Sequence, residues 1–154
     1  MEYFILFLPL LASIISGFFG KLIGDKMSQI ITSLFVTVSA LLSLVVFYKV
    51  ITSGYENNLI IATWINSGSL NVNWSINIDA LSSVMLVVVT VISSLVHIYS
   101  IGYMSHDAHK ARFMSYLSLF TFAMLTLVTS DNFIQLFFGW EGVGLCSYLS
   151  LIHI

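Results

Sequence analysis

The sequence predicts an all-α integral membrane protein of about five transmembrane helices, with a small β-hairpin outside the membrane between the second and third. Hydrophobic residues make up 58% of the 154 residues and charged residues only 8%, whereas soluble domains have about 45–50% and about 25%. Five long apolar runs approach the roughly 20 residues that cross a bilayer. One segment between these runs alternates polar and apolar residues with the period of a strand.

The apolar runs divide the chain into four parts. Residues 1–58 hold the first two helices, at about 3–23 and 28–50, and residues 59–78 hold the hairpin. Residues 79–130 hold the third and fourth helices, at about 80–104 and 113–130, and residues 131–154 hold the fifth. The first run follows Met1 and Glu2 without a basic segment or a clear cleavage site, so it is predicted to be a membrane helix and not a cleaved signal peptide.

The hairpin is predicted from two apolar patterns around a turn. Residues 59–65 are rich in β-branched and aromatic side chains, residues 66–69 have a turn composition, and residues 71–78 alternate strictly. The apolar row of Val72, Trp74, Ile76 and Ile78 is expected to pack on the helix ends or on a neighbouring subunit. Asp79 and the Asp131–Asn132 pair are expected to cap the third and fifth helices.

Four of the five basic residues fall on one side of the predicted topology, and these are Lys21, Lys26, Lys110 and Arg112. The positive-inside rule assigns this side to the cytoplasm, or to the matrix of an organelle. The N-terminus and the hairpin are then expected on the periplasmic or intermembrane side.

Several function classes are excluded by the composition. No basic patch is present to bind nucleic acid, and the single cysteine excludes an internal disulfide framework or a CxxC motif. The histidines and carboxylates are too scattered for an obvious metal cage, so no metal site is expected.

Glu141 is the first candidate functional residue. It lies about 15 Å along the fifth helix from Asp131, near the middle of a hydrocarbon core about 30 Å thick. An ionised carboxylate there costs at least about 2.5–3.5 kcal/mol, and every Lys and Arg of the chain lies at a helix end or in a loop. Glu141 is therefore predicted to be a proton relay whose basic partner lies elsewhere; the alternative is a protonated structural glutamate. Gly139, Gly142 and Cys146 form a small-residue face that lets another helix approach closely.

His97 is the second, weaker candidate. It lies in the third helix near Ser93, Ser94 and Ser100. A neutral imidazole hydrogen-bonded to a serine is the simpler interpretation, and a proton relay is the alternative, because histidine titrates near neutral pH.

Residues 130–149, with the string GWEGVGLCSYL at 139–149, resemble a signature of subunit L (chain 5 in mitochondria) of respiratory complex I, the proton-pumping NADH:quinone oxidoreductase. Residues 97–104 and the entry to the third helix at 79–82 resemble the same family. The resemblance implies an N-terminal fragment of a larger antiporter-like bundle, in which Glu141 pairs with a lysine on a later helix. It implies other membrane-arm subunits as partners, and NADH, FMN, iron–sulfur clusters and quinone for the complex, with no cofactor on this chain. The oxidoreductase activity would thus belong to the complex.

Two other hypotheses stay open. A subunit of a multi-subunit sodium/proton antiporter would share the fold and the glutamate, and a structural membrane anchor would leave Glu141 inert. After Leu149 the sequence departs from the family pattern, so residues 150–154 are expected to be non-native, His153 is expected to have no role, and the fragment is expected to be inactive alone.

Overall fold

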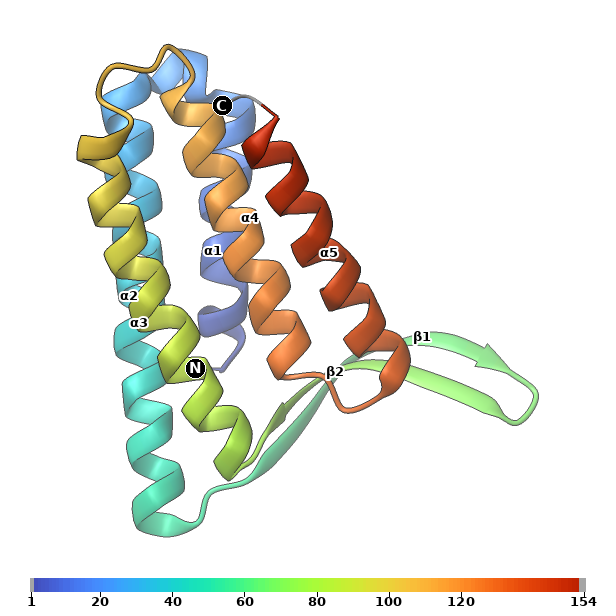
Figure 1. Ribbon diagram of the computed structural model, residues 1–154. Coiled ribbons are helices and arrows are strands. Elements are labelled where there is room, and N and C mark those ends of the chain that lie inside the picture. Colours follow the sequence, from blue (N-terminus) through green and yellow to red (C-terminus); the bar gives the residue numbers. More distant parts are fainter. Residues whose placement is uncertain (1, 153–154) are drawn as a thin grey trace.

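Helices that run alternately up and down form a bundle, and a two-stranded sheet joins the second helix to the third (Figure 1). The computed structural model describes residues 2–152, apart from the side chain of Asn57. The elements in chain order are α1 (Glu2–Ile23), α2 (Asp25–Ser53), β1 (Asn57–Ser67), β2 (Leu70–Ile78), α3 (Ala80–Tyr103), α4 (Lys110–Val128) and α5 (Phe133–Leu151). α1 and α3 each pack against α2 and α4, and α5 packs against α4.

Four of these helices, α1 to α4, are long and apolar enough to cross a membrane. α5 is a helix of 19 residues, but the polar side chains of Gln135 and Glu141 dilute its apolar character. The sequence predicts about five spanning helices, and four of the described helices are long and apolar enough to span a membrane. Ser150 and Leu151 continue α5, whereas His153 and Ile154 lie outside the described residues.

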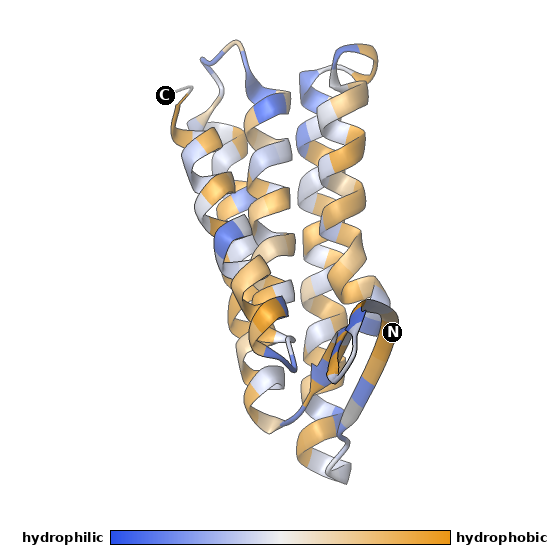
Figure 2. Ribbon diagram, turned by 90° about the vertical axis from the view of Figure 1, so that its right-hand side faces the viewer, coloured by the Kyte–Doolittle hydropathy of each residue, from blue (hydrophilic) through white to orange (hydrophobic). Residues whose placement is uncertain are grey.

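The helix interfaces are lined by hydroxyl groups, while large apolar side chains point outward. Between α1 and α2, Ser39 Oγ donates to the carbonyl of Ile5 at 2.6 Å. Between α2 and α3, the hydroxyls of Ser43 and Thr90 lie 2.7 Å apart. Figure 2 shows apolar residues along the helices and hydrophilic ones mainly in the connections and the hairpin. Small hydroxyl residues inside and large apolar residues outside are the arrangement expected in lipid, where close packing and hydrogen bonds hold helices together.

The helix boundaries extend slightly beyond the apolar runs. α2 begins at Asp25 and α4 at Lys110, each about one turn earlier than the sequence predicts. Gly24 is the single residue between α1 and α2, with a φ of 93° that side-chain-bearing residues rarely adopt. Both predicted caps are confirmed: Asp79 accepts from the backbone N–H of Ser82 at 2.7 Å, and Asn132 accepts from that of Gln135 at 2.8 Å.

The predicted β-hairpin is confirmed, and its apolar row packs on the helix ends. β1 and β2 pair antiparallel from Asn57–Ile78 to Ser67–Leu70, and Gly68 takes the positive φ of the turn. Ile76 and Ile78 are buried with a cluster from the adjoining helices, and these helical residues are Ile5, Leu6, Val46, Val50, Leu86 and Leu125. The half of the hairpin near the turn projects beyond α5 (Figure 1).

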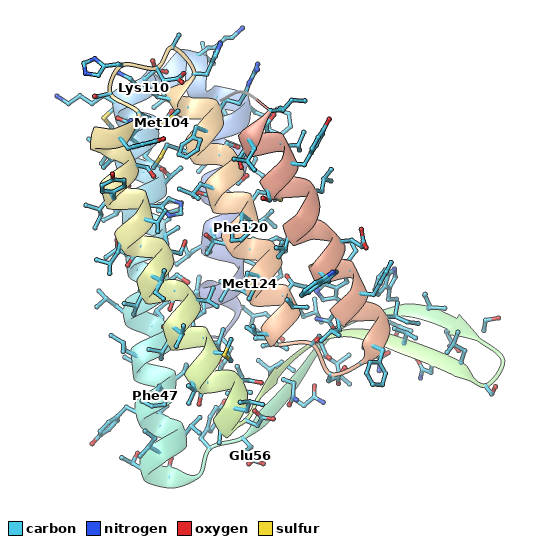
Figure 3. The ribbon with its side chains drawn as sticks, in the orientation of Figure 1. Phe47, Glu56, Met104, Lys110, Phe120 and Met124 are labelled. Carbon is cyan, nitrogen blue, oxygen red and sulfur yellow. The ribbon has the colours of Figure 1, made fainter. Side chains whose placement is uncertain are left out.

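Four of the five basic residues gather at the opposite end of the bundle from the hairpin, and Lys49 lies near the hairpin end of α2. Lys21 and Lys26 flank the connection between α1 and α2, and Lys110 and Arg112 begin α4. Figure 3 labels Lys110 at this end. We call this the basic end, and the end that carries the hairpin, Asp79 and Asp131 the hairpin end.

Candidate functional site

Glu141 lies near the middle of α5, on the side that faces away from the rest of the described bundle. It is eight residues from Phe133, which places it about 12 Å along the helix. Its side chain is exposed, whereas Gly139 and Cys146 on either side are buried. The carboxyl therefore points toward whatever covers the outer face of α5.

The opposite face of α5 is the small-residue face that the sequence predicts, and it packs against α4. A Cβ atom added to Gly139 would lie 2.8 Å from the backbone N and Cα of Leu127, and one added to Gly142 would lie 3.2 Å from Cβ of Ala123. Cys146 is buried further along the same face. This contact fixes the rotation of α5, and the rotation in turn directs Glu141 outward.

A cluster of amide side chains at the start of α5 holds the hairpin, and sequence reasoning missed it. Gln135 is fully buried; its Oε1 accepts from the backbone N–H of Ser75 at 3.1 Å, and its Nε2 donates to the Ser75 carbonyl at 2.7 Å. Asn132 caps α5 and also donates to the carbonyl of Asn73 at 2.9 Å. The sequence signals this cluster only by Gln135, an isolated glutamine in an apolar run. Its partner Ser75 is 60 residues away, so no local pattern links the two.

Asp131 adds a charged contact to this cluster. Its carboxylate accepts from Asn58 at 2.9 Å and from Asn132 at 3.1 Å. Partial burial acts to raise the pKa of the Asp131 carboxyl, but the hydrogen bonds from these amides prevail and hold the pKa below its ordinary value. We call Gln135, Asn132, Asp131 and Asn58 the amide clamp.

His97 is fully buried between α3 and α4. Nδ1 lies 2.7 Å from the carbonyl oxygen of Ser93, and Nε2 lies 3.1 Å from the hydroxyl of Ser118. A carbonyl can only accept a hydrogen bond, so Nδ1 carries the proton and Nε2 accepts from Ser118. This geometry matches a neutral imidazole bonded to a serine, and the relay role stays a prediction.

The serines around His97 divide into two groups. The Ser93 hydroxyl lies 3.3 Å from Nδ1 and also bonds the hydroxyl of Thr121 on α4. Ser94 and Ser100 instead donate to carbonyls of their own helix. The chain of polar contacts from His97 therefore leads into α4 and does not follow α3.

The two candidate residues are not brought together. His97 faces α4 from α3, Glu141 faces outward from α5, and α4 lies between those helices (Figure 1). Among residues 2–152, no three histidine, cysteine or carboxylate side chains gather in a group that could hold a metal ion.

Comparison with known proteins gives a consistent set of relatives. Residues 64–114 match a family model described as the N-terminus of chain 5 of NADH-ubiquinone oxidoreductase (complex I). The chain is 57% identical over 145 residues to NADH-ubiquinone oxidoreductase chain 5 of Phytophthora infestans, and 56% identical over 153 residues to that of Arabidopsis thaliana. It is 55% identical over 148 residues to NADH-quinone oxidoreductase subunit L of Rickettsia felis.

The matches cover nearly all of this chain and a small part of each relative. They extend over 94%, 99% and 94% of the chain but only 22%, 23% and 22% of the relatives, in the same order. The chain thus spans less than a quarter of the length of these relatives.

Proposed function

Because the chain belongs to the family of NADH-ubiquinone oxidoreductase chain 5, named subunit L in the Rickettsia relatives, we propose that it contributes Glu141 to a proton path through the membrane arm of that enzyme. The redox chemistry of the enzyme takes place on other subunits, which carry NADH, FMN, iron–sulfur clusters and quinone. In this proposal the part of this chain is to move protons.

The observation that carries the proposal is the direction in which Glu141 points. An ionisable side chain on the outer face of a helix would meet hydrocarbon if this bundle stood alone, at a cost of at least about 2.5–3.5 kcal/mol. The packing of Gly139 on Leu127 prevents α5 from turning that carboxyl inward. Glu141 therefore faces further protein, and a basic residue beyond the described segment pairs with it there.

A carboxyl placed between two protein layers can exchange a proton with either side. Pairing with a cation favours the carboxylate, and loss of that pairing favours the protonated acid. A change in the distance between Glu141 and its basic partner therefore takes up or releases a proton, and a movement driven by distant redox chemistry supplies that change.

His97 is proposed as a second, weaker relay position. Its Nε2 accepts from Ser118 and its Nδ1 proton is shared between the carbonyl and hydroxyl of Ser93. A proton arriving at Nε2 and leaving from Nδ1 would pass from Ser118 toward Ser93 and Thr121. Such transfer through both ring nitrogens is open to histidine because its two nitrogens are chemically distinct sites.

The orientation and partners follow from the same proposal. The basic end carries Lys21, Lys26, Lys110 and Arg112, so it faces the cytoplasm or the matrix, and the hairpin end faces the periplasm or intermembrane space. Other membrane-arm subunits are the partners.

The test is Glu141→Gln in the full-length subunit within its assembled complex. Glutamine keeps the size and polarity of the side chain but cannot carry a proton, so proton translocation through this subunit should fall about tenfold or more. Acidification of inverted membrane vesicles on addition of NADH measures translocation, and NADH oxidation measured in parallel shows that electron transfer persists.

Glu56→Gln is the matched control, because Glu56 is an exposed carboxylate in the connection between α2 and β1. It should leave translocation unchanged. If Glu141→Gln also pumped normally, Glu141 would be inert and the chain would be a structural anchor. If the vesicles acidified only with a sodium gradient and independently of NADH, the antiporter alternative would replace the proposal.

A further inference from the structure

A groove at the basic end of the bundle lies between α1 and α4. It has a volume of about 550 Å³, which falls within the range of ligand sites in proteins, about 300–1,000 Å³. Basic side chains stand at its mouth and apolar side chains along its length. The groove is lined by Lys21 and Arg112 at the mouth and by Leu10, Ile14, Phe18 and Leu119 below it.

The close approach of the two helices creates the groove. A Cβ atom added to Gly17 would lie 2.8 Å from the hydroxyl of Ser115, and one added to Gly20 would lie 2.9 Å from Cβ of Ala111. Ser16 closes the contact by donating to the Ala111 carbonyl at 2.8 Å. At the basic end the contact between α1 and α4 is therefore made by small residues, whereas Phe7 and Phe122 contact each other further along the same pair of helices.

The charge at the mouth is positive. Lys21 and Arg112 line it with a single carboxylate, that of Asp25. Neither Lys21 nor Arg112 forms an ion pair with another residue of the described segment 2–152. Lys26 and Lys110 lie at the same end of the bundle and add to the positive field there.

We propose that this groove binds one anionic phospholipid, with the phosphate between Lys21 and Arg112 and an acyl chain along Phe18, Ile14 and Leu10. The two cations end a pair of membrane-spanning helices, so they lie at the depth of lipid headgroups. The apolar wall runs from them toward the membrane centre, as an acyl chain does. Basic pockets between transmembrane helices are a recurrent recognition site for anionic lipids.

Other occupants fit the groove less well. A free phosphate ion would use the mouth and leave the apolar wall uncovered. A helix of another polypeptide would bury Lys21 and Arg112, and burying unpaired cations is costly. A zwitterionic phospholipid would gain less from the two cations, because the cation of its own headgroup offsets the charge of its phosphate. The site is independent of Glu141, which lies on α5.

The test uses the assembled complex that contains the full-length subunit, delipidated in detergent. The complex is incubated with phosphatidylglycerol that carries a photoactivatable group in its acyl chain, and mass spectrometry maps the labelled peptides. Labelling of the peptides with Phe18 and Leu119 is expected, at far lower concentration than with the matching phosphatidylcholine probe. Since one basic residue near the membrane contributes about 1 kcal/mol, about fivefold in affinity, Lys21→Gln together with Arg112→Gln should weaken labelling about 25-fold.

Lys49→Gln, which removes a cation near the other end of α2, is the matched control and should label like the parent. Leu119→Trp, which fills the groove and keeps both cations, should abolish labelling even if the double variant fails to assemble. Equal labelling by the two lipid probes would overturn the proposal. So would labelling that survives Leu119→Trp, or labelling of another polypeptide in place of the peptides with Phe18 and Leu119.

Discussion

Replacing Gly139 with alanine should separate α5 from α4. The added Cβ would lie 2.8 Å from two backbone atoms of Leu127, well inside the optimal carbon contact of about 3.5–4.0 Å. Backbone atoms cannot move aside as a flexible side chain can, so the helices must shift. Overpacking of this kind costs about 1–3 kcal/mol, and the higher helix propensity of alanine offsets at most about 1 kcal/mol of that cost.

The same helix offers a matched control. Gly144→Ala adds the same atom where no described residue outside the nearby helix backbone lies within 4 Å, so the clash with α4 is absent. Thermal unfolding of the purified complex with full-length subunit should show a lower midpoint for Gly139→Ala and an equal or higher one for Gly144→Ala. Proton translocation should fall in Gly139→Ala as well, because moving α5 moves Glu141. Equal stability of the two variants would refute the packing argument.

Three further outcomes follow from the clamp and from His97. Gln135→Leu leaves the backbone N–H and C=O of Ser75 unpaired at about 1–3 kcal/mol each, and faster hydrogen exchange across β2 should report the loosened hairpin; unchanged exchange would show that the clamp is dispensable. Because the pKa of Asp131 is lowered in the folded protein, the stabilisation that its carboxylate gives is present above its ordinary pKa of 3.8 and is lost as the pH falls through the lower folded value. Hydrogen exchange at Asn58 should stay slow down to that pH range and become faster below it. Asp131→Asn should remove this dependence of the exchange rate on pH. His97→Gln, whose amide can replace both hydrogen bonds but cannot titrate near neutral pH, should assemble normally and pump more slowly, whereas full pumping would leave His97 a structural residue.

The sequence predicts the elements that depend on local pattern. The alternation at residues 71–78 predicts the hairpin because a strand side chain returns to the same face every second residue. Asp79 and Asn132 mark helix starts because their short polar side chains bond the free N–H groups two or three positions on. The glycines around Glu141 predict a close helix contact because only small residues allow it.

Features that depend on distant residues or on water were harder to predict. α2 and α4 begin at Asp25 and Lys110, about a turn before the apolar runs, because a helix end in water has no need of apolar residues. The clamp joins Gln135 to Ser75 across 60 positions, and no local pattern encodes such a pair. In α5, apolar residues surround the helix on nearly every side, so hydrophobic periodicity could not show which face meets α4.

The connection at Gly24 has a consequence for how the chain enters the bilayer. Because a single residue connects α1 and α2, neither helix can move far from the other during membrane insertion. We therefore expect the two helices to enter the bilayer together as an antiparallel pair, an arrangement in which the hydroxyl of Ser39 can reach the Ile5 carbonyl. We expect a residue inserted at this turn to weaken the pairing of α1 with α2 during membrane insertion.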